Sequence, residues 1–495
     1  MRKDLLFYLI VIILFVVAIF LGFYNLDGWL INDDEGVYLY SAWRVSLGEI
    51  PYQDFFVSQL PLSFYFAGFL FKVFGPDVRV ARGLCFSLFL IVAVFIYIIC
   101  RRIFNLNKYI SLLSALIFIF TKNINFLSKT FMPDSFMIFW GTIALYFVLK
   151  AEKLESKNAK HLFLFGLFSG LATLSKLSGF LLILGYFLFL LFNFLFNKEK
   201  LNNFIIKLVY PMVGFFLSFG IIYIIMLIFV SNTYYCTLGY HLNKEKIYTF
   251  TVLIIFFKRL CKFIGNHNYA VIPIALISIV AGFIQKKREE ILLFFLILPF
   301  FFLAFTPTDF FIRYLIFTLI PFTILFGKSL EIIKQNKKIF YFSIPVIFIL
   351  LILCTASTFN FKKISRYDEG TRNLVNYINE HSNPEDYIFS DYAGINYYSQ
   401  RPCPPRLVDV SEAMTKSGQI TSKDIEKECE KYNVKIILVD IGSSAHHLKN
   451  LIDYSKFKDY LKKKYIFRGT IKREFQVFEI YIRNDGVQST NDKNF

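Results

Sequence analysis

The sequence lacks the cysteine patterns that hold structural metals. Its seven cysteines form no CxxC pair and show no metal-ligand spacing, which argues against a zinc module. The polar C-terminal region contains neither a GxGxxG nor a P-loop pattern, so nothing there predicts nucleotide binding. Cys403 and Cys429 lie in that region and could pair, although the sequence does not decide whether they do.

Acidic residues are absent from the middle of the long apolar segments, and the chain has no internal repeat. An ion-coupled carrier usually places an ionisable residue at mid-membrane. Many transporters are also built from inverted repeats around a central site. Both absences weigh against a transporter.

What the sequence has in excess is apolar length. The chain of 495 residues is 56% hydrophobic and has a mean hydropathy of +0.53, whereas soluble domains are about 45–50% apolar. Apolar runs recur from residue 5 to residue 356, which predicts an all-α polytopic membrane domain over 1–356. About eleven transmembrane helices are expected, near 5–23, 83–100, 109–120, 136–149, 162–175, 180–196, 208–230, 271–284, 291–305, 314–327 and 339–356.

The formal charge of +18 has two explanations. A nucleic-acid partner would need one basic stripe, but the Lys and Arg residues recur between apolar runs, as cytoplasmic loops do. With the N-terminus inside, Lys and Arg are more than threefold denser in the cytoplasmic segments than in the outer ones. We therefore expect a multi-pass protein of the cell membrane with no nucleic-acid partner, a cytoplasmic N-terminus and an extracytoplasmic C-terminus.

One short apolar stretch, Leu60–Gly75, tests this orientation. It has about 15 residues, which is too few for a full span. If it crossed the membrane, the basic segments RRIFNLNK and QKKREE would face outward. We therefore expect an interfacial or re-entrant helix inside a long first outer loop, 24–82.

The composition changes after residue 356. DEGTRNLVNYINEHS predicts an amphipathic helix, DYIFSDY and VKIILVD predict buried strands, SKDIEKECEKYN predicts a surface helix, and RPCPPR predicts a loop. These alternating elements predict a small extracytoplasmic α/β domain over 357–485. The last residues, 486–495, are expected to form a disordered tail.

The unusual polar residues all fall on the outer side of this topology. They are Asp33, Asp34, Glu35 and Asp54 in the first outer loop, Asp134 at the mouth of a helix, Lys176 and Arg313 at outer turns, and His241 in the 231–270 segment. Each has a plainer explanation: a solvated loop, a helix cap for Asp134, a snorkelling lysine or an interfacial arginine. Asp34 and Glu35, however, stand among apolar and aromatic residues, which favours a functional role, whereas His241 is interpreted as a plain loop residue.

Carboxylates beside basic residues at one membrane interface suit sugar transfer from a polyprenyl phosphate. A carboxylate can take the proton of the attacking hydroxyl, and an Arg, a Lys or a metal ion can stabilise the departing phosphate. A desolvated carboxylate among like charges has a raised pKa, which suits a base. The alternatives are a transporter or flippase of lipid-linked sugars and a non-catalytic membrane scaffold with an outer binding domain.

Four motifs, in order along the chain, resemble those of the GT-C glycosyltransferases. The resemblance is greatest to the branch of the protein O-mannosyltransferases and the lipid A aminoarabinose transferases. That branch reads D-E-x-x-Y, G-x-x-P-Y-x-D and then P-L, which here are Asp34–Tyr38, Gly48–Asp54 and Pro61–Leu62. PDSFMIFW resembles its second acidic site, LATLSKLSGFLLIL its L-x-K-x-x-G turn, and RYLIFTLIPFTIL its R-Y helix.

The resemblance implies an inverting transferase of the hexosyl or pentosyl type that uses a polyprenyl-phosphate-linked monosaccharide. Asp34 would be the catalytic acid-base or metal-site residue with Glu35 beside it, and Asp134 would be the second acid. Arg313 and Lys176 would face the donor phosphate. The residues expected to line the substrate loop are Tyr38, Tyr52, Asp54 and Gln59. Metal dependence differs across the superfamily, so a divalent cation (Mg²⁺ or Mn²⁺) on Asp34 and Asp134 stays open.

The chain departs from the family pattern in two places. Aminoarabinose transferases carry a Lys before a Pro-Pro pair in the first loop, where this chain reads Gln59-Leu60-Pro61. This difference puts an aminoarabinose donor and a lipid A acceptor in doubt. No WWD signature occurs in the outer domain, which argues against en bloc glycan transfer and leaves the sugar and the acceptor unassigned.

Overall fold

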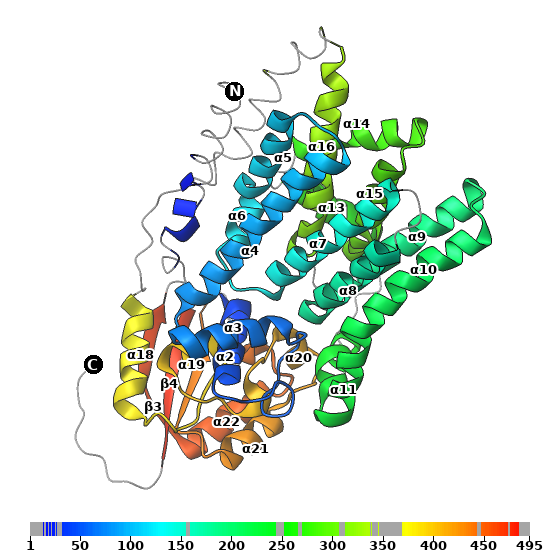
Figure 1. The fold of residues 1–495 in the computed structure, drawn as a ribbon. Coiled ribbons are helices and arrows are strands. Elements are labelled where there is room, and N and C mark those ends of the chain that lie inside the picture. The colour runs from blue at the N-terminus through cyan, green and yellow to red at the C-terminus, as the bar shows by residue number, and fades with distance from the viewer. Residues whose placement is uncertain are drawn as a thin grey trace.

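The computed structural model describes residues 32–154, 159–243, 252–265, 270–305, 312–336, 369–442, 447–473 and 476–484, with scattered positions before residue 32 and residues 338 and 345. A bundle of apolar helices forms one part, and a small α/β unit lies beside it (Figure 1). Two helices of the first outer loop, α2 (Asp33–Ser46) and α3 (Leu62–Phe74), lie where the two parts meet.

The bundle is helical because a helix satisfies its own backbone hydrogen bonds, as an apolar segment in lipid requires. Its helices are α4 (Val78–Ile98), α5 (Lys108–Phe120), α6 (Lys122–Ser128), α7 (Pro133–Lys153), α8 (Ala159–Ser175), α9 (Leu181–Phe196), α10 (Leu201–Phe215), α11 (Ile221–Phe229), α13 (Val252–Gly265), α14 (Val271–Ile284), α15 (Arg288–Phe302) and α16 (Leu319–Lys334). Short helical segments extend several of them, namely η1 (Ile99–Ile103), η2 (Leu177–Phe180), η3 (Phe216–Gly220), η5 (Leu303–Phe305) and η6 (Ile312–Thr318).

Five helical segments of the described chain are long and apolar enough to cross a membrane, or up to six if the bent pair α5–α6 is one span. That pair is bent by 64°. α8 has 17 residues and α14 has 14, fewer than the roughly 20 of a full span. The expected helices are present wherever the structure describes them, but 5–23 and 339–356 fall largely outside the described residues. The described residues therefore support an apolar multi-helix bundle rather than the full count of eleven spans.

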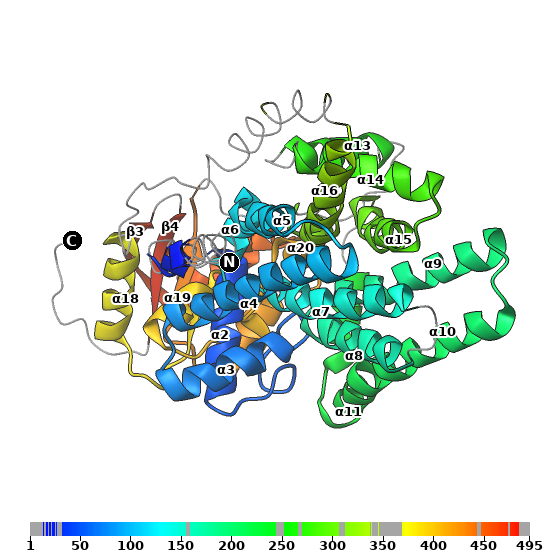
Figure 2. The ribbon, with the colours of Figure 1, turned by 45° about the horizontal axis from the view of Figure 1, so that its top comes forward.

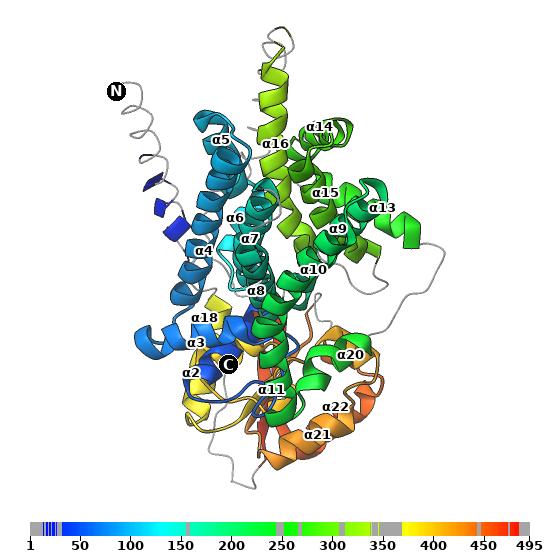
Figure 3. The same cartoon turned by 45° about the vertical axis from the view of Figure 1, so that its right-hand side comes forward.

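The short apolar stretch of the first outer loop forms α3, which has 13 residues. It ends at Gly75, whose φ of 84° favours glycine. α3 packs against α2, and in Figure 3 it runs crosswise below the end of α4. This orientation suits the interfacial helix that the sequence predicts.

The C-terminal unit is a four-stranded sheet with the order β1-β2-β4-β3. β1 (Ile388–Ser390) and β2 (Ile436–Asp440) are parallel, and β3 (Tyr465–Arg473) and β4 (Gln476–Arg483) form an antiparallel hairpin. Its helices are α18 (Glu369–His381), α19 (Ala393–Ser399), α20 (Glu412–Lys416), α21 (Ser422–Lys431) and α22 (Tyr454–Lys464). α19 packs against α2, and in Figure 2 α18 lies beyond α19, on the side away from α2 and α4.

The predicted elements of this unit are confirmed. Both buried strands, the amphipathic helix α18, the surface helix α21 and the RPCPPR loop occur where the sequence predicts them. The hairpin of β3 and β4 was not predicted. The thiols of Cys403 and Cys429 are both free and buried.

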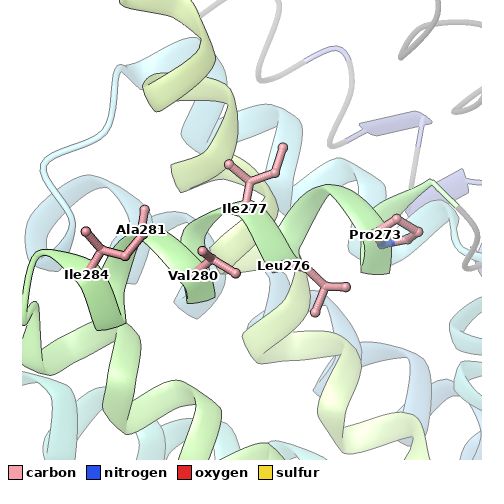
Figure 4. A pocket seen from close by; sticks show the side chains of 6 residues that line it. All are labelled: Pro273, Leu276, Ile277, Val280, Ala281 and Ile284. Carbon is pink, nitrogen blue, oxygen red and sulfur yellow. The ribbon is translucent and has the colours of Figure 1, made fainter.

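An apolar groove of about 470 Å³ runs along α14 (Figure 4). It is lined by Pro273, Leu276, Ile277, Val280, Ala281 and Ile284. None of these side chains carries a polar group, so the groove suits hydrocarbon and offers nothing to a polar reaction. The candidate chemistry therefore lies elsewhere, at the start of α2.

Candidate active site

Three consecutive acids begin α2, and they point to three different parts of the molecule. Asn32 caps the helix by accepting a hydrogen bond from the Glu35 amide at 2.8 Å. Acids in a first turn interact favourably with the positive end of the helix dipole. Successive helical residues are rotated by about 100°, so Asp33, Asp34 and Glu35 cannot share one environment.

Asp34 points toward the membrane bundle and binds Arg313. Its Oδ2 lies 2.8 Å from an Nη of Arg313, in η6 just before α16. The Asp34 side chain is 43% exposed, whereas that of Arg313 is 19% exposed. The carboxylate is therefore reachable, while the guanidinium is largely enclosed.

Asp134 binds Lys176, the second cation that the sequence singles out. Lys176 Nζ donates to Asp134 Oδ1 at 2.6 Å, and both groups are buried. Asp134 is not the cap of α7, because Met132 is the N-cap and Pro133 occupies the first helical position. Lys176 does not snorkel to solvent, because its ammonium is held by this carboxylate.

Tyr314 brings the two ion pairs together. Lys176 Nζ lies 4.7 Å from the centre of the Tyr314 ring, and the Arg313 guanidinium carbon lies 6.0 Å from it. The ring face attracts cations. Two carboxylates and two cations thus surround one phenol, and their formal charges cancel.

Glu35 points away from this group, into the core. Its two oxygens accept hydrogen bonds from Arg82 of α4 at 2.7 and 2.6 Å, and Oε1 also accepts from the Phe131 amide at 2.8 Å. Arg82 donates further to the Leu26 carbonyl at 2.7 Å. Glu35 is fully buried. Its carboxylate therefore ties α2 to α4 and to the segment that precedes Asp134, and it is enclosed where no substrate reaches it.

Asp33 faces the C-terminal unit. Partial desolvation raises the pKa of Asp33, while the positive charges of His447 and Arg473 act to lower it. Asp391 follows β1, and Asp440 ends β2. Burial raises the pKa of Asp391 to about 7. Charges of the C-terminal unit, those of His447, Arg473 and Asp440, thus act on the acid that lies outside the D-E-x-x-Y pattern.

The predicted substrate-loop residues fall into two groups. Tyr38 is buried, and its burial and the negative charge of Asp34 raise the pKa of its phenol. The other three shape the loop itself. Tyr52 donates to the Gln59 carbonyl at 2.7 Å, and Asp54 Oδ2 accepts from the Ile50 amide at 2.7 Å. Contact of these four residues with a substrate stays a prediction.

In the structure each of the two candidate metal-binding acids is paired with a cation. Asp34 is paired with Arg313 and Asp134 with Lys176, so cations already balance both carboxylates. Among the described residues, no group of three or more His, Cys, Asp or Glu could hold a metal ion. A divalent cation needs several oxygen ligands. A divalent cation on Asp34 and Asp134 would therefore need further oxygen ligands, and such a cation stays a prediction.

Sequence reasoning missed Tyr314, which lies between the two ion pairs, and Arg82, which holds the helix that carries Asp34. An arginine near the start of an apolar helix is normally an interfacial anchor, so nothing set Arg82 apart. Tyr314 follows Arg313 in the R-Y motif and could have been predicted from it.

Comparison with known proteins places this geometry in a fold family. Residues 58–223 match the family of dolichyl-phosphate-mannose-protein mannosyltransferases. No curated protein matches the sequence. ArnT from Cupriavidus metallidurans is similar in structure: its apo form has a TM-score of 0.65 at 13% identity over 95% of this chain and 97% of that chain.

Two ligand-bound structures are also similar. ArnT bound to undecaprenyl phosphate has a TM-score of 0.64 at 12% identity over 97% of this chain and 99% of that one. The oligosaccharyltransferase AglB from Archaeoglobus fulgidus, in complex with an inhibitory peptide and a dolichol-phosphate, has a TM-score of 0.56 at 12% identity over 99% of this chain and 75% of that one. The chain thus shares the GT-C fold of these structures, which is the fold that its motifs predict.

Proposed function

We propose that this chain is a membrane glycosyltransferase that moves one monosaccharide from a polyprenyl-phosphate-linked donor to an acceptor hydroxyl. The observation that carries the proposal is the pair of adjacent ion pairs, Asp34 with Arg313 and Asp134 with Lys176. The family match and the neighbours that bind undecaprenyl phosphate and dolichol-phosphate support the donor class. The site would lie at the outer membrane face, with the N-terminus cytoplasmic and the C-terminal unit extracytoplasmic.

The two cations would hold the donor phosphate. A sugar phosphodiester carries one negative charge, and Arg313 and Lys176 each already neutralise a carboxylate. When the phosphate binds, it competes with Asp34 for Arg313. The carboxylate that gives up this partner then becomes available as a base.

Asp34 is the better candidate for the base because it is accessible. It is 43% exposed, whereas Asp134 is 3% exposed and buried against Lys176. A general base must lie within hydrogen-bond reach of the acceptor proton. Asp134 would instead hold Lys176 in place for the phosphate.

The transfer then balances as a single displacement. The acceptor oxygen gives its proton to Asp34 and forms a bond to the anomeric carbon from the face opposite the phosphate. The bond from that carbon to the phosphate oxygen breaks, and its electron pair leaves with the phosphate. Arg313 and Lys176 stabilise the additional negative charge. Attack from the opposite face inverts the anomeric centre.

Purified chain tests the proposal with a panel of labelled polyprenyl-phosphate sugars, hexoses and pentoses. Threonine-containing peptides and n-octyl glycosides serve as hydroxyl acceptors. We expect transfer from at least one donor, and loss of it in Arg313→Leu. The absence of transfer from every donor, together with transport of intact donor in proteoliposomes, would favour the flippase alternative.

A further inference from the structure

A second set of contacts joins the substrate loop to the C-terminal unit through the backbone amide and carbonyl of Ser58. The Ser58 amide donates to Asp409 Oδ2 at 3.1 Å, and Asp409 belongs to the C-terminal unit. The Ser58 carbonyl accepts from His241 Nε2 at 3.0 Å, and His241 lies in α12 (Tyr240–Leu242). The backbone of one buried residue is thus held at its amide and at its carbonyl by two separate segments.

Neighbouring contacts join the same three parts of the chain: the first outer loop, α12 and the C-terminal unit. The Phe56 amide donates to the Pro405 carbonyl at 2.8 Å, and the hydroxyls of Tyr240 and Ser411 lie 2.7 Å apart. The Phe56 and Tyr240 rings meet edge-on with centroids 5.9 Å apart. The first outer loop, the segment after α11 and the C-terminal unit therefore pack as one joint beside the ion pairs.

Two buried phenols relate this joint to the reacting acids. Burial raises the pKa of the Tyr38 and Tyr240 hydroxyls, and the negative charges of Asp34 and Asp409 act on both hydroxyls in the same direction.

We propose that Asp409 is a positioning residue that, with His241, fixes the Phe56–Gln59 segment and so shapes the acceptor side of the site. This inference rests on the proposed function. The cations Arg313 and Lys176 come from the bundle, whereas the partners of Ser58 come from the C-terminal unit and α12. The position of the Phe56–Gln59 segment is therefore fixed by groups on the aqueous side of the bundle. A hydroxyl-bearing acceptor would arrive from that side.

Substitutions at Asp409 can separate the hydrogen bond from the charge. Asp409→Asn keeps an oxygen that can accept from the Ser58 amide, whereas Asp409→Ala removes it. His241→Gln keeps a donor near the Nε2 position, whereas His241→Leu does not. Asp459→Asn, an exposed acid of α22, is the matched control for the loss of one negative charge.

Hydrogen exchange of the 56–60 peptide is the first measurement, and it needs no substrate. We expect exchange to be about tenfold faster in Asp409→Ala and His241→Leu, because each loses one buried hydrogen bond. Asp409→Asn, His241→Gln and the control should exchange like the wild type. Unchanged exchange in Asp409→Ala would overturn the proposal.

Kinetics is the second measurement, with the threonine peptide or n-octyl glycoside that the wild-type chain glycosylates. Asp409→Ala should raise KM for that acceptor about tenfold and leave kcat and the donor KM nearly unchanged, and Asp409→Asn should restore the acceptor KM. If the Asn and Ala variants both abolish kcat, the charge itself takes part in the chemistry and positioning is refuted. A wild-type chain that transfers no sugar would refute the proposed function instead, while the exchange result would still decide whether Asp409 holds the loop.

Discussion

Removal of the Glu35 carboxylate tests how the helix that carries Asp34 is anchored. The side chains of Glu35 and Arg82 are each 1% exposed, so Glu35→Leu leaves a guanidinium buried without its partner. Breaking a buried ion pair in this way costs about 3–5 kcal/mol. The Phe131 amide also loses its acceptor. We expect the free energy of unfolding to fall by about 3–5 kcal/mol.

The assay is reversible unfolding of the chain in mixed micelles, with two comparison variants. Glu35→Leu combined with Arg82→Leu should recover much of the loss, because neither charge is then left buried. Glu49→Leu breaks the more exposed pair with Arg44 and should cost no more than about 1 kcal/mol. A loss in Glu35→Leu equal to that in Glu49→Leu would refute the anchoring role.

Three further predictions concern the cations, the pH and the thiols. Lys176→Met should lower transfer about 100-fold, as loss of one stabilising donor does. Lys176→Met also leaves the Asp134 carboxylate buried without its partner and should lower the unfolding temperature. Adding Asp134→Asn should restore the unfolding temperature but not the transfer. The pKa of Asp391 is raised by burial to about 7, from about 3.9 unfolded, so its stabilising contribution is present in acid and is lost as the pH rises toward 7. The unfolding temperature should therefore fall between about pH 4 and 7, and less so in Asp391→Asn. Cys403 and Cys429 should both alkylate in non-reduced, denatured chain, as mass spectrometry would show.

The helices were predictable from sequence because lipid allows a long apolar segment few alternatives. Their ends were less so. α7 begins at Pro133 rather than near 136, since proline fits the first position of a helix. α4 begins at Val78, after Asp77 caps it by accepting from the Arg79 amide. The hairpin of β3 and β4 was missed because β3 is largely exposed and mixes charged with apolar residues.

The site was predictable as a set of residues on one side of the membrane, but not as a set of pairs. The distribution of Lys and Arg and the four motifs predicted that Asp34, Asp134, Lys176 and Arg313 share one side of the membrane. Which cation pairs with which acid depends on how α7, η2 and η6 pack, and the sequence does not show this. Adjacency in the sequence also did not reveal that Asp34 and Glu35, expected side by side in the site, have separate surroundings. The turn of the helix instead directs Glu35 into the core.

The most direct test of the central claim compares two neighbouring acids on one helix. Asp34→Asn and Asp33→Asn each remove one negative charge from the first turn of α2, but only Asp34 pairs with Arg313. Sugar transfer from the polyprenyl-phosphate donor should fall at least about 100-fold in Asp34→Asn, as expected for loss of a general base. Asp33→Asn should keep most of its activity. Wild-type transfer by Asp34→Asn would contradict the account.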